Sequence, residues 1–355
     1  MHNYKNADHP RVLIVAMSGI GNLLMQTPLI GRLKEENPTA EISVIVAPRG
    51  TKDVLKTNAK IKNIYQGNPK PSFKQWIGMV QNIQKEKFDV GIVTYPGQLV
   101  TSSSILYFGN VRQRIGNFYN YYFLKKSGLF LSDALPEKPI HDVEQNLNLL
   151  SPLGIENNNR LYAYDFPLSI EDFSMAENFL TESKITGEKY IGIHPGTNKD
   201  MIYKRWPTEQ WIKLADQLAD VYKAKILIFG GPEENFLKSA IKKNMRHKAY
   251  GVSLPLRATA ALISKCAFFV SNDSGLMHIS VSQKVQTFGL FGPTDERRTA
   301  PWGPFGHVIR AEGTSPNYDV TKLRQIKNQP TADSSMLALN EKFVLNKIEA
   351  SLSEH

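Results

Sequence analysis

Short apolar runs, separated by helix-like patterns and glycine- or proline-containing loops, recur along this chain and constrain its fold more than any other feature. Residues 11–17 read RVLIVAM, a continuous β-branched run typical of a strand buried on both faces. An apolar stripe at helical spacing follows, and residues 41–47 (EISVIVA) and 87–94 (KFDVGIVT) form further strand-like runs. Alternating strand and helix patterns predict βαβ units, which build a parallel sheet. We therefore expect an α/β fold.

The same alternation restarts in the second half of the chain. Strand-like runs occur at 190–194, 225–229, 267–270 and 286–291, and helical patterns at 208–222, 256–265 and 275–282. A length of 355 residues corresponds to about two domains. We predict two Rossmann-like domains, residues 1–170 and 171–335, followed by a C-terminal helix within 336–355.

Composition narrows the class of protein. Cys266 is the single cysteine, which excludes a disulfide framework and a cysteine-based metal cluster. No apolar run approaches ~18 residues, and the N-terminal segment lacks the apolar core of a signal peptide, so we expect a cytoplasmic protein. The net charge of +10 is spread without a long basic run. It suits nucleotides, phosphorylated glycolipids or an anionic membrane surface, or it is an ordinary solvated basic surface. Without a basic stripe carrying interleaved aromatics, we expect no nucleic-acid partner.

The segment VSNDSGLMH, residues 270–278, carries the most chemistry. A buried strand ends in Asp273-Ser274-Gly275, and a helix is predicted to begin at once. The first N–H groups of a helix have no partner within it and favour an anion such as phosphate. Ser274 adds a hydroxyl, and Gly275 allows a ligand to approach the backbone closely. The alternative is that Asp273 only caps the helix and that His278 is packed in the core.

Two further loops follow predicted strands in this half. The first is His194-Pro195-Gly196-Thr197, followed by Lys204-Arg205-Trp206-Pro207, whose two cations could neutralise a diphosphate. The alternative is an exposed basic turn with a tryptophan in the core. The second is the run FGGPEE, residues 229–234. Its acidic residues, Glu233 and Glu234, either accept from ribose hydroxyls or serve a helix N-terminus electrostatically.

The loop after the first strand reads Ser18-Gly19-Ile20-Gly21-Asn22. It matches a dinucleotide fingerprint only in part, because Leu24 replaces the third glycine and the next strand ends without an acidic residue. We interpret it as a loop that lines a substrate, with Asn22 as a helix cap. The chain contains no Asp-x-Asp and no GxxxxGK[ST] pattern. We therefore expect neither a diphosphate held by a metal ion on an Asp-x-Asp motif nor a P-loop.

Taken together and in order, these segments resemble glycosyltransferase family 9, the heptosyltransferases of lipopolysaccharide core assembly. The resemblance rests on VLIVAMSGIGNLLMQTPLIGRLKEENPTAEISVIVAP, FDVGIV, HPGTNKDMIYKRWP, ILIFGGPEE and VSNDSGLMHISVSQKVQTFGLFGPTDERRTAPWG. It implies a GT-B fold, two Rossmann-like domains facing a central cleft. The C-terminal domain would hold a nucleotide-sugar donor, and the acceptor would lie against the N-terminal domain.

The resemblance also implies roles for individual residues. Lys204 and Thr197 would bind the donor phosphates, Asp273, Ser274 and Gly275 the sugar and pyrophosphate, and Glu233 or its neighbour Glu234 the nucleoside. Gly19, Gly21 and Asn22 would form the acceptor-side loop. The family reaction inverts the anomeric centre without a metal or other cofactor, the nucleotide-diphosphate-sugar being a co-substrate.

This chain departs from the family at one position. Asn22 stands where the family has an aspartate, its presumed general base, and an amide cannot take a proton near pH 7. Three readings follow. Another group, among them His141, Asp142 and Glu144, takes the proton; Asn22 orients an acceptor that is already reactive; or turnover is slow or absent.

The sequence thus predicts a cytoplasmic glycosyltransferase at the inner membrane face. It would transfer a sugar, with heptose from ADP-heptose as a candidate, to a lipopolysaccharide-type or other cell-surface glycan. Two alternatives are a non-catalytic or weakly active nucleotide-sugar-binding protein and a GT-B-like nucleotide-sugar epimerase.

Overall fold

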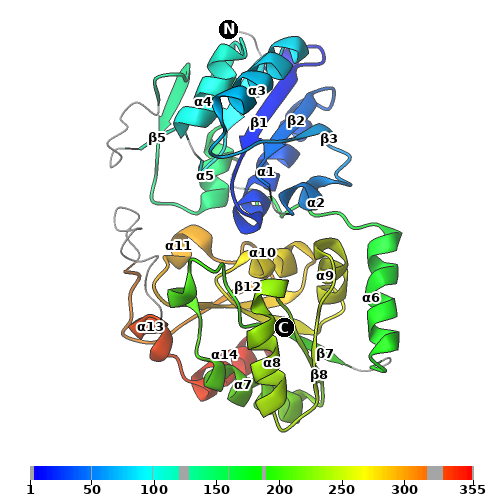
Figure 1. Ribbon diagram of the computed structural model, residues 1–355. Coiled ribbons are helices and arrows are strands. Elements are labelled where there is room, and N and C mark those ends of the chain that lie inside the picture. The colour runs from blue at the N-terminus through cyan, green and yellow to red at the C-terminus, as the bar shows by residue number, and fades with distance from the viewer. Residues whose placement is uncertain are drawn as a thin grey trace. The chain divides into compact units, whose positions relative to one another are not determined.

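The computed structural model describes residues 4–48, 50–97, 99–119, 128–158, 160–185, 189–317 and 331–353 (Figure 1). The chain divides into two compact units, Met1–Pro167 and Leu168–His355. Of the predicted segment 171–335, residues 186–188 and 318–330 lie outside the described part, as do the last two residues of 336–355.

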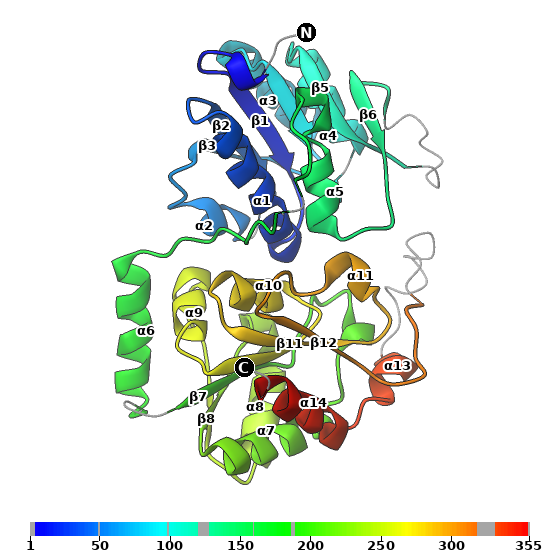
Figure 2. The same cartoon turned by 180° about the vertical axis from the view of Figure 1, so that it is seen from behind.

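Unit 1 is a parallel sheet covered by helices on both faces. Its strands run in the order β3-β2-β1-β4-β5-β6. Figures 1 and 2 show α3 and α4 on one face and α1 and α5 on the other. The described strands are β1 (Arg11–Ala16), β2 (Glu41–Val46), β3 (Ile61–Gln66), β4 (Val90–Val93), β5 (Gln113–Phe118) and β6 (Asp133–Pro136). The helices are η1 (Tyr4–Asn6), α1 (Ile20–Glu36), α2 (Thr51–Leu55), α3 (Phe73–Glu86), α4 (Leu99–Phe108), α5 (Asp142–Asn148) and η3 (Ser151–Leu153).

Unit 2 repeats this topology. Its parallel strands run in the order β12-β11-β10-β7-β8-β9, the same path through the sheet as in unit 1. The described strands are β7 (Tyr190–His194), β8 (Lys225–Ile228), β9 (Ala249–Gly251), β10 (Phe268–Asn272), β11 (Gln286–Phe291) and β12 (Gly306–Arg310). The helices are α6 (Ile170–Glu182), η4 (Ile202–Lys204), α7 (Thr208–Tyr222), η5 (Pro232–Glu234), α8 (Asn235–Asn244), α9 (Leu256–Ile263), α10 (Gly275–Ser282), α11 (Glu296–Thr299), α13 (Ser334–Leu337) and α14 (Glu341–Ser353). Both units are thus Rossmann-like, which confirms the predicted fold.

The sequence explains how each sheet is buried. All four residues of β4 and all five of β7 and β10 are buried, as the continuous apolar runs predict for central parallel strands. In unit 2 the core joins β7 and β10 to one face of α7. It also joins them to the terminal helix α14, through Val344 and Ile348. The segment predicted as a separate C-terminal helix therefore packs into the core of unit 2.

Helix α1 contains a proline in its interior, yet the carbonyl group that the proline cannot serve still accepts a hydrogen bond. Pro28 has no N–H group to donate to the carbonyl of Leu24, four residues earlier. Thr27 Oγ1 donates to that carbonyl instead, at 2.7 Å. The Thr-Pro pair thus replaces the missing backbone hydrogen bond with a side-chain one, and the helix continues to Glu36.

Ligands of such sheets bind beyond the carboxyl ends of the strands, where the strand order reverses. In unit 1 this point lies between β1 and β4, and in unit 2 between β7 and β10. The loops that follow β7 and β10 carry Thr197 and Ser274, and the loop after β1 leads directly into α1, whose first turn contains Asn22. The topology therefore places the predicted residues at the edges where ligands of this fold bind.

Candidate functional site

The site in unit 2 is built around an ion pair between two loops. Lys204, the last residue of η4, places Nζ 2.7 Å from Oδ2 of Asp273, which directly follows β10. Both side chains are largely buried, with 13% and 8% of their areas exposed. Burial raises the pKa of Asp273, but the Lys204 charge and hydrogen bond outweigh it and lower the pKa. The Asp273 carboxylate is therefore ionised at neutral pH.

Helix α10 begins directly after this pair. Ser274 is its N-cap residue by position, but its side chain makes no capping hydrogen bond. The first N–H groups of α10 thus lack a side-chain cap, which is the arrangement that favours an anion. The alternative that Asp273 caps the helix is wrong, because Ser274 occupies the N-cap and the Asp273 carboxylate pairs with Lys204. His278, one turn further on, is buried, as the packed interpretation predicts.

A histidine that sequence reasoning did not select connects Ser274 to Glu234 of the FGGPEE run. His194, the last residue of β7, places Nδ1 2.9 Å from Ser274 Oγ and Nε2 3.2 Å from Glu234 Oε2. A neutral imidazole that donates from Nε2 to the carboxylate accepts at Nδ1, so the Ser274 hydroxyl donates to His194 in this tautomer. The position of this histidine at a strand end, before Pro195-Gly196, was the available signal.

The two acidic residues of the FGGPEE run differ in environment. Glu234 is buried, accepts from the Gly231 N–H at 2.9 Å and lies so close to Gly196 that a Cβ there would overlap its carboxylate. Burial raises the Glu234 pKa, but His194, the Gly231 N–H and the Arg205 charge together lower it. Glu233 is exposed. The structure therefore draws Glu234 into the His194 network and leaves Glu233 at the surface.

The HPGT loop is held by the basic residue next to Lys204. Arg205 donates from Nε to Thr197 Oγ1 and from Nη2 to the Thr197 carbonyl, both at 3.1 Å. The Thr197 hydroxyl donates to the Met201 carbonyl at 3.0 Å and is buried. Arg205 thus has a partner within the loop, so the interpretation of both cations as an exposed basic turn is wrong.

Asn272, at the end of β10, fixes the two loops relative to each other. Its Nδ2 donates to the Pro195 carbonyl at 2.8 Å, and its Oδ1 accepts from the Trp206 N–H at 3.1 Å. Trp206 is in the core, so the part of the alternative interpretation that concerns the tryptophan is right, and Pro207 caps α7 by position. Asn272 is fully buried and was missed, because a single asparagine in a strand gives no distinguishing pattern.

The loop of unit 1 presents a simpler arrangement. Gly19 is the N-cap of α1, so Gly21 and Asn22 lie inside the first turn and the expectation that Asn22 caps the helix is wrong. Asn22 is half-buried. Behind it, Gln26 donates to Ser18 Oγ and to the Tyr95 carbonyl, which joins the β1 and β4 loops.

The three groups weighed as substitutes for the missing aspartate lie at the start of α5. His141 is the N-cap of this helix, and its Nδ1 accepts from the Val143 N–H at 3.1 Å. A neutral imidazole has one acceptor nitrogen, so this hydrogen bond occupies it. Asp142 is buried and Glu144 is half-buried. Asn146 of the same helix bonds Tyr95, which links α5 to the β4 loop.

Among the residues that the structure describes, no three His, Cys, Asp or Glu side chains lie close enough together to hold a metal ion. Within the same ranges, no helix has both the length and the apolar character needed to cross a membrane.

Comparison with known proteins identifies the family. The family model described as glycosyltransferase family 9 (heptosyltransferase) matches residues 76–328. Lipooligosaccharide heptosyltransferase 2 of Haemophilus influenzae is 25% identical over 362 residues, covering 97% of this chain and 99% of the relative. Lipopolysaccharide heptosyltransferase 3 of Escherichia coli is 25% identical over 301 residues, covering 79% and 83%.

Solved structures agree with the fold. A family 9 glycosyltransferase of Veillonella parvula superposes with a TM-score of 0.82 at 20% identity, covering 99% of both chains. The ADP-heptose heptosyltransferase II of E. coli gives 0.77 at 18% identity, covering 97% of this chain and 99% of that one. These likenesses confirm the GT-B fold. By its match to the family model, this chain belongs to glycosyltransferase family 9 and is a glycosyltransferase.

Proposed function

We propose that this protein transfers heptose from ADP-heptose to a lipopolysaccharide-type glycan acceptor, with inversion and without a metal or cofactor. The observation that carries the proposal is the Lys204–Asp273 ion pair beside the N-terminus of α10. The names of the heptosyltransferase relatives support the sugar and the class of acceptor. An E. coli heptosyltransferase solved with ADP-2-deoxy-2-fluoro heptose, with a TM-score of 0.67 to this chain, supports the donor.

The site in unit 2 suits a leaving nucleoside diphosphate. Negative charge grows on the diphosphate as its bond to the sugar breaks, and preorganised donors lower the energy of that charge. Lys204 has three N–H donors and gives one to Asp273. Together with Ser274, Gly275 and the start of α10, it would hold the pyrophosphate. Thr197 would join them once its hydroxyl turns away from the Met201 carbonyl.

The nucleoside would be held by the glycine loop after β8. The exposed Glu233 would accept from ribose hydroxyls, and the buried Glu234 would act indirectly, by orienting His194. In the tautomer that donates from Nε2 to Glu234, His194 in turn accepts from Ser274. Asp273 would orient Lys204 in the same way and lie beside the sugar.

The acceptor would be bound by unit 1, at the loop of Gly19, Gly21 and Asn22. An amide donates and accepts but does not take up a proton near pH 7, so we assign Asn22 the role of orienting the acceptor hydroxyl. With the Nδ1 of His141 occupied, the carboxylates of Asp142 and Glu144 are the candidates for the base.

We further assign a surface of unit 1 to contact with an anionic membrane, where a glycolipid acceptor is anchored. Phe73, Tyr107, Phe108 and Leu129 are exposed there, Phe73 by 76% and Leu129 by 68%. Ring contacts at 5.2 to 6.3 Å connect the aromatic members through Trp76 and Phe130. We call these six residues the aromatic cluster: Phe73, Trp76, Tyr107, Phe108, Leu129 and Phe130. Exposed Lys74 and Arg112 are sequence neighbours of its elements, and their charge is complementary to anionic lipid. The protein would then be cytoplasmic and peripheral.

A binding screen followed by product analysis tests this function. Nucleotide-sugars are added one at a time during thermal unfolding, since a ligand that binds the native state raises the apparent melting temperature. We expect ADP-heptose to give the largest shift. Incubation with a heptose-free lipopolysaccharide core should then yield a heptosylated product with the inverted linkage. A larger shift with another nucleotide-sugar, or release of the sugar without transfer, would contradict the proposal.

A further inference from the structure

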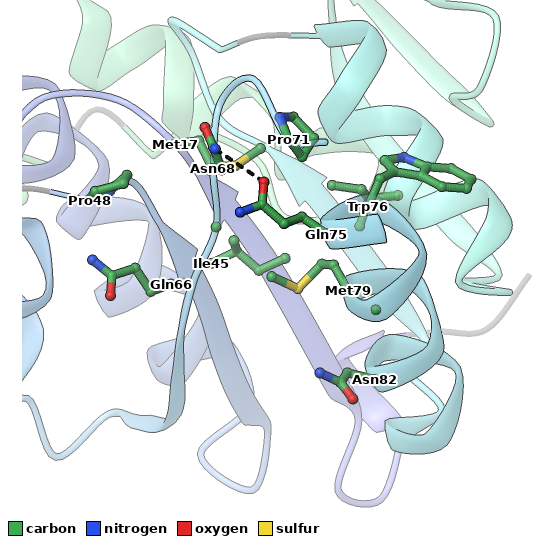
Figure 3. Close-up of a pocket in the computed structure, with 13 residues that line it drawn as sticks. Met17, Ile45, Pro48, Gln66, Asn68, Pro71, Gln75, Trp76, Met79 and Asn82 are labelled. Atoms are coloured by element: carbon green, nitrogen blue, oxygen red, sulfur yellow. Dashed lines mark hydrogen bonds between the residues drawn. The ribbon is translucent and has the colours of Figure 1, made fainter. Parts of the chain in front are cut away.

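Unit 1 contains a pocket whose lining includes none of Gly19, Gly21 and Asn22. It measures about 480 Å³ and lies between α3 and the carboxyl ends of β1, β2 and β3 (Figure 3). Met17, Pro48 and Gln66 mark those strand ends, and Trp76 and Met79 line it from α3. Met17 stands two residues before Gly19 in the chain, so one loop serves both the pocket and the proposed acceptor site.

The lining of this pocket is uncharged, although the protein carries a net charge of +10. None of its 13 lining residues is Lys, Arg, Asp, Glu or His. A phosphate or carboxylate would lose its hydration here without meeting a compensating cation from the lining. The pocket therefore selects against a charged ligand group.

The polar groups of the lining are carboxamides. Gln66 and Asn82 have exposed side chains that make no hydrogen bond with other described residues. Asn68 donates from Nδ2 to the side-chain oxygen Oε1 of Gln75 at 3.3 Å. The same Oε1 also accepts from the Ser72 N–H. A carboxamide offers two donors and an acceptor, which matches a hydroxyl group in either of its roles.

The apolar part of the lining is held in place. Trp76 donates from Nε1 to Ser104 Oγ at 3.2 Å, and its ring contacts Phe73 and Phe108. A ring fixed in this way offers an apolar platform without losing side-chain freedom when a ligand binds. Apolar groups and carboxamides that line one pocket suit a sugar ring, which has C–H groups on its faces and hydroxyls at its edge.

We propose that this pocket binds an uncharged sugar residue of the acceptor glycan. This inference rests on the proposed function, because it names the acceptor that unit 1 would take. Gln66, Trp76 and Asn82 lie on different sides of the pocket (Figure 3), so a single sugar ring would lie against Ile45 and Met79 and bond the Gln75 carboxamide beside them. The residue that accepts the new linkage would lie at the adjoining Asn22 loop.

Gly78 provides a test that leaves the fold intact. This glycine lines the pocket from α3, and a Cβ built on it meets nothing within 4 Å. Gly78→Leu therefore fills the pocket, and it replaces a poor helix former with a good one. Gly31→Leu is the matched control, because Gly31 also lies in a helix, meets nothing within 4 Å and is outside the pocket lining.

Binding is measured by saturation-transfer NMR with three probes: a methyl hexoside, the same hexose as its 6-phosphate, and octanoate. We expect the methyl hexoside to receive saturation from the wild type and Gly31→Leu, and at least about fivefold less from Gly78→Leu. No signal in the wild type, or an equal signal in Gly78→Leu, overturns the proposal. It is also overturned if the probe that Gly78→Leu displaces is the phosphate or octanoate.

Kinetics separate this proposal from the proposed function. Gly78→Leu should raise the acceptor KM about tenfold and leave the dissociation constant of ADP-heptose unchanged. If the wild type binds no nucleotide-sugar but the hexoside signal is sensitive to Gly78→Leu, the function fails and the pocket stands. If transfer occurs and its acceptor KM is the same in Gly78→Leu, the pocket fails and the function stands.

Discussion

Lys204 and Asp273 form an ion pair with an Nζ–Oδ2 distance of 2.7 Å, although they are 69 positions apart in the chain. The pair joins the loop after β7 to the loop after β10, the two strands between which the strand order of unit 2 reverses. It holds an ammonium group beside the uncapped N-terminus of α10. The charge of Lys204 and the positive end of the α10 dipole therefore act at the same place, the start of α10.

The pair should make the stability of the protein depend on pH. The Asp273 pKa is lowered from its ordinary value of 3.8, burial being outweighed by Lys204. A lowered pKa contributes stability that is present above the unfolded value and is lost as the pH falls through the folded value. At pH 7, Asp273→Asn should reduce the free energy of unfolding by about 1.5–3 kcal/mol, the typical value of a hydrogen bond to a charged group.

Urea unfolding between pH 7 and pH 2 measures this effect. The difference between wild type and Asp273→Asn should shrink as the pH falls below 3.8. Asp200→Asn, which changes an exposed aspartate three residues after the HPGT loop, should match the wild type throughout. A difference that stays constant down to pH 2 would show that folding does not lower the pKa of Asp273.

Glu233 and Glu234 should respond differently to the same substitution. Glu234→Ala removes the acceptor of His194 and of the Gly231 N–H, and an unsatisfied buried group costs about 1–3 kcal/mol. It should therefore lower the melting temperature. Glu233→Ala should leave the melting temperature unchanged and weaken ADP binding about tenfold. Equal melting temperatures for the two variants would argue against the network around His194.

Asn22→Asp tests the proton transfer. A positioned general base is typically worth roughly 10²–10⁴-fold in rate. With the base on α5, as proposed, Asn22→Asp should leave the kcat of transfer within a few-fold of the wild type. If the site instead lacks a base, the new carboxylate should raise kcat by at least about tenfold, with a loss of rate at low pH. Glu144→Gln in the wild-type background is the companion variant. An unchanged kcat in Asn22→Asp, with a large loss in Glu144→Gln, would place the base on α5.

The aromatic cluster should determine binding to membranes. Phe73→Ser and Leu129→Ser each remove exposed apolar area without opening the core. Both should reduce co-sedimentation with vesicles that contain anionic phosphatidylglycerol. Ile170→Ser is the control, because Ile170 is 86% exposed but lies on α6 of unit 2. Equal sedimentation of all four proteins would contradict the assignment of this surface.

The central elements of the fold were predictable, and the peripheral ones were not. The predicted bounds of β7, α7, α10 and β11 agree with the structure, because buried parallel strands and amphipathic helices leave clear patterns. Strand β3 (IKNIYQ) was missed because it lies at the sheet edge and is only partly buried. Helix α4 (LVTSSSILYF) was missed because its serines and β-branched residues are poor helix formers.

The site was predictable as a group of loops but not as a set of contacts. Strand ends of a parallel sheet meet at one edge, so the loops of Thr197, Lys204 and Ser274 could be grouped from their positions. The choice between Glu233 and Glu234 depends on which carboxylate turns toward His194, and neighbouring acidic residues give no signal for that. The pocket beside Trp76 was not predictable, since it depends on how α3 lies on the sheet.

The most direct measurement is a calorimetric titration of ADP-heptose into three proteins: the wild type, Lys204→Gln and Lys199→Gln. Glutamine at position 204 keeps an N–H donor for Asp273 but removes the charge, and Lys199 is an exposed lysine of the same loop region. We predict that Lys204→Gln weakens binding at least about tenfold, or about 1.4 kcal/mol, and that Lys199→Gln leaves it unchanged. Equal affinity in all three proteins would contradict the assignment of the donor diphosphate to Lys204 and the start of α10.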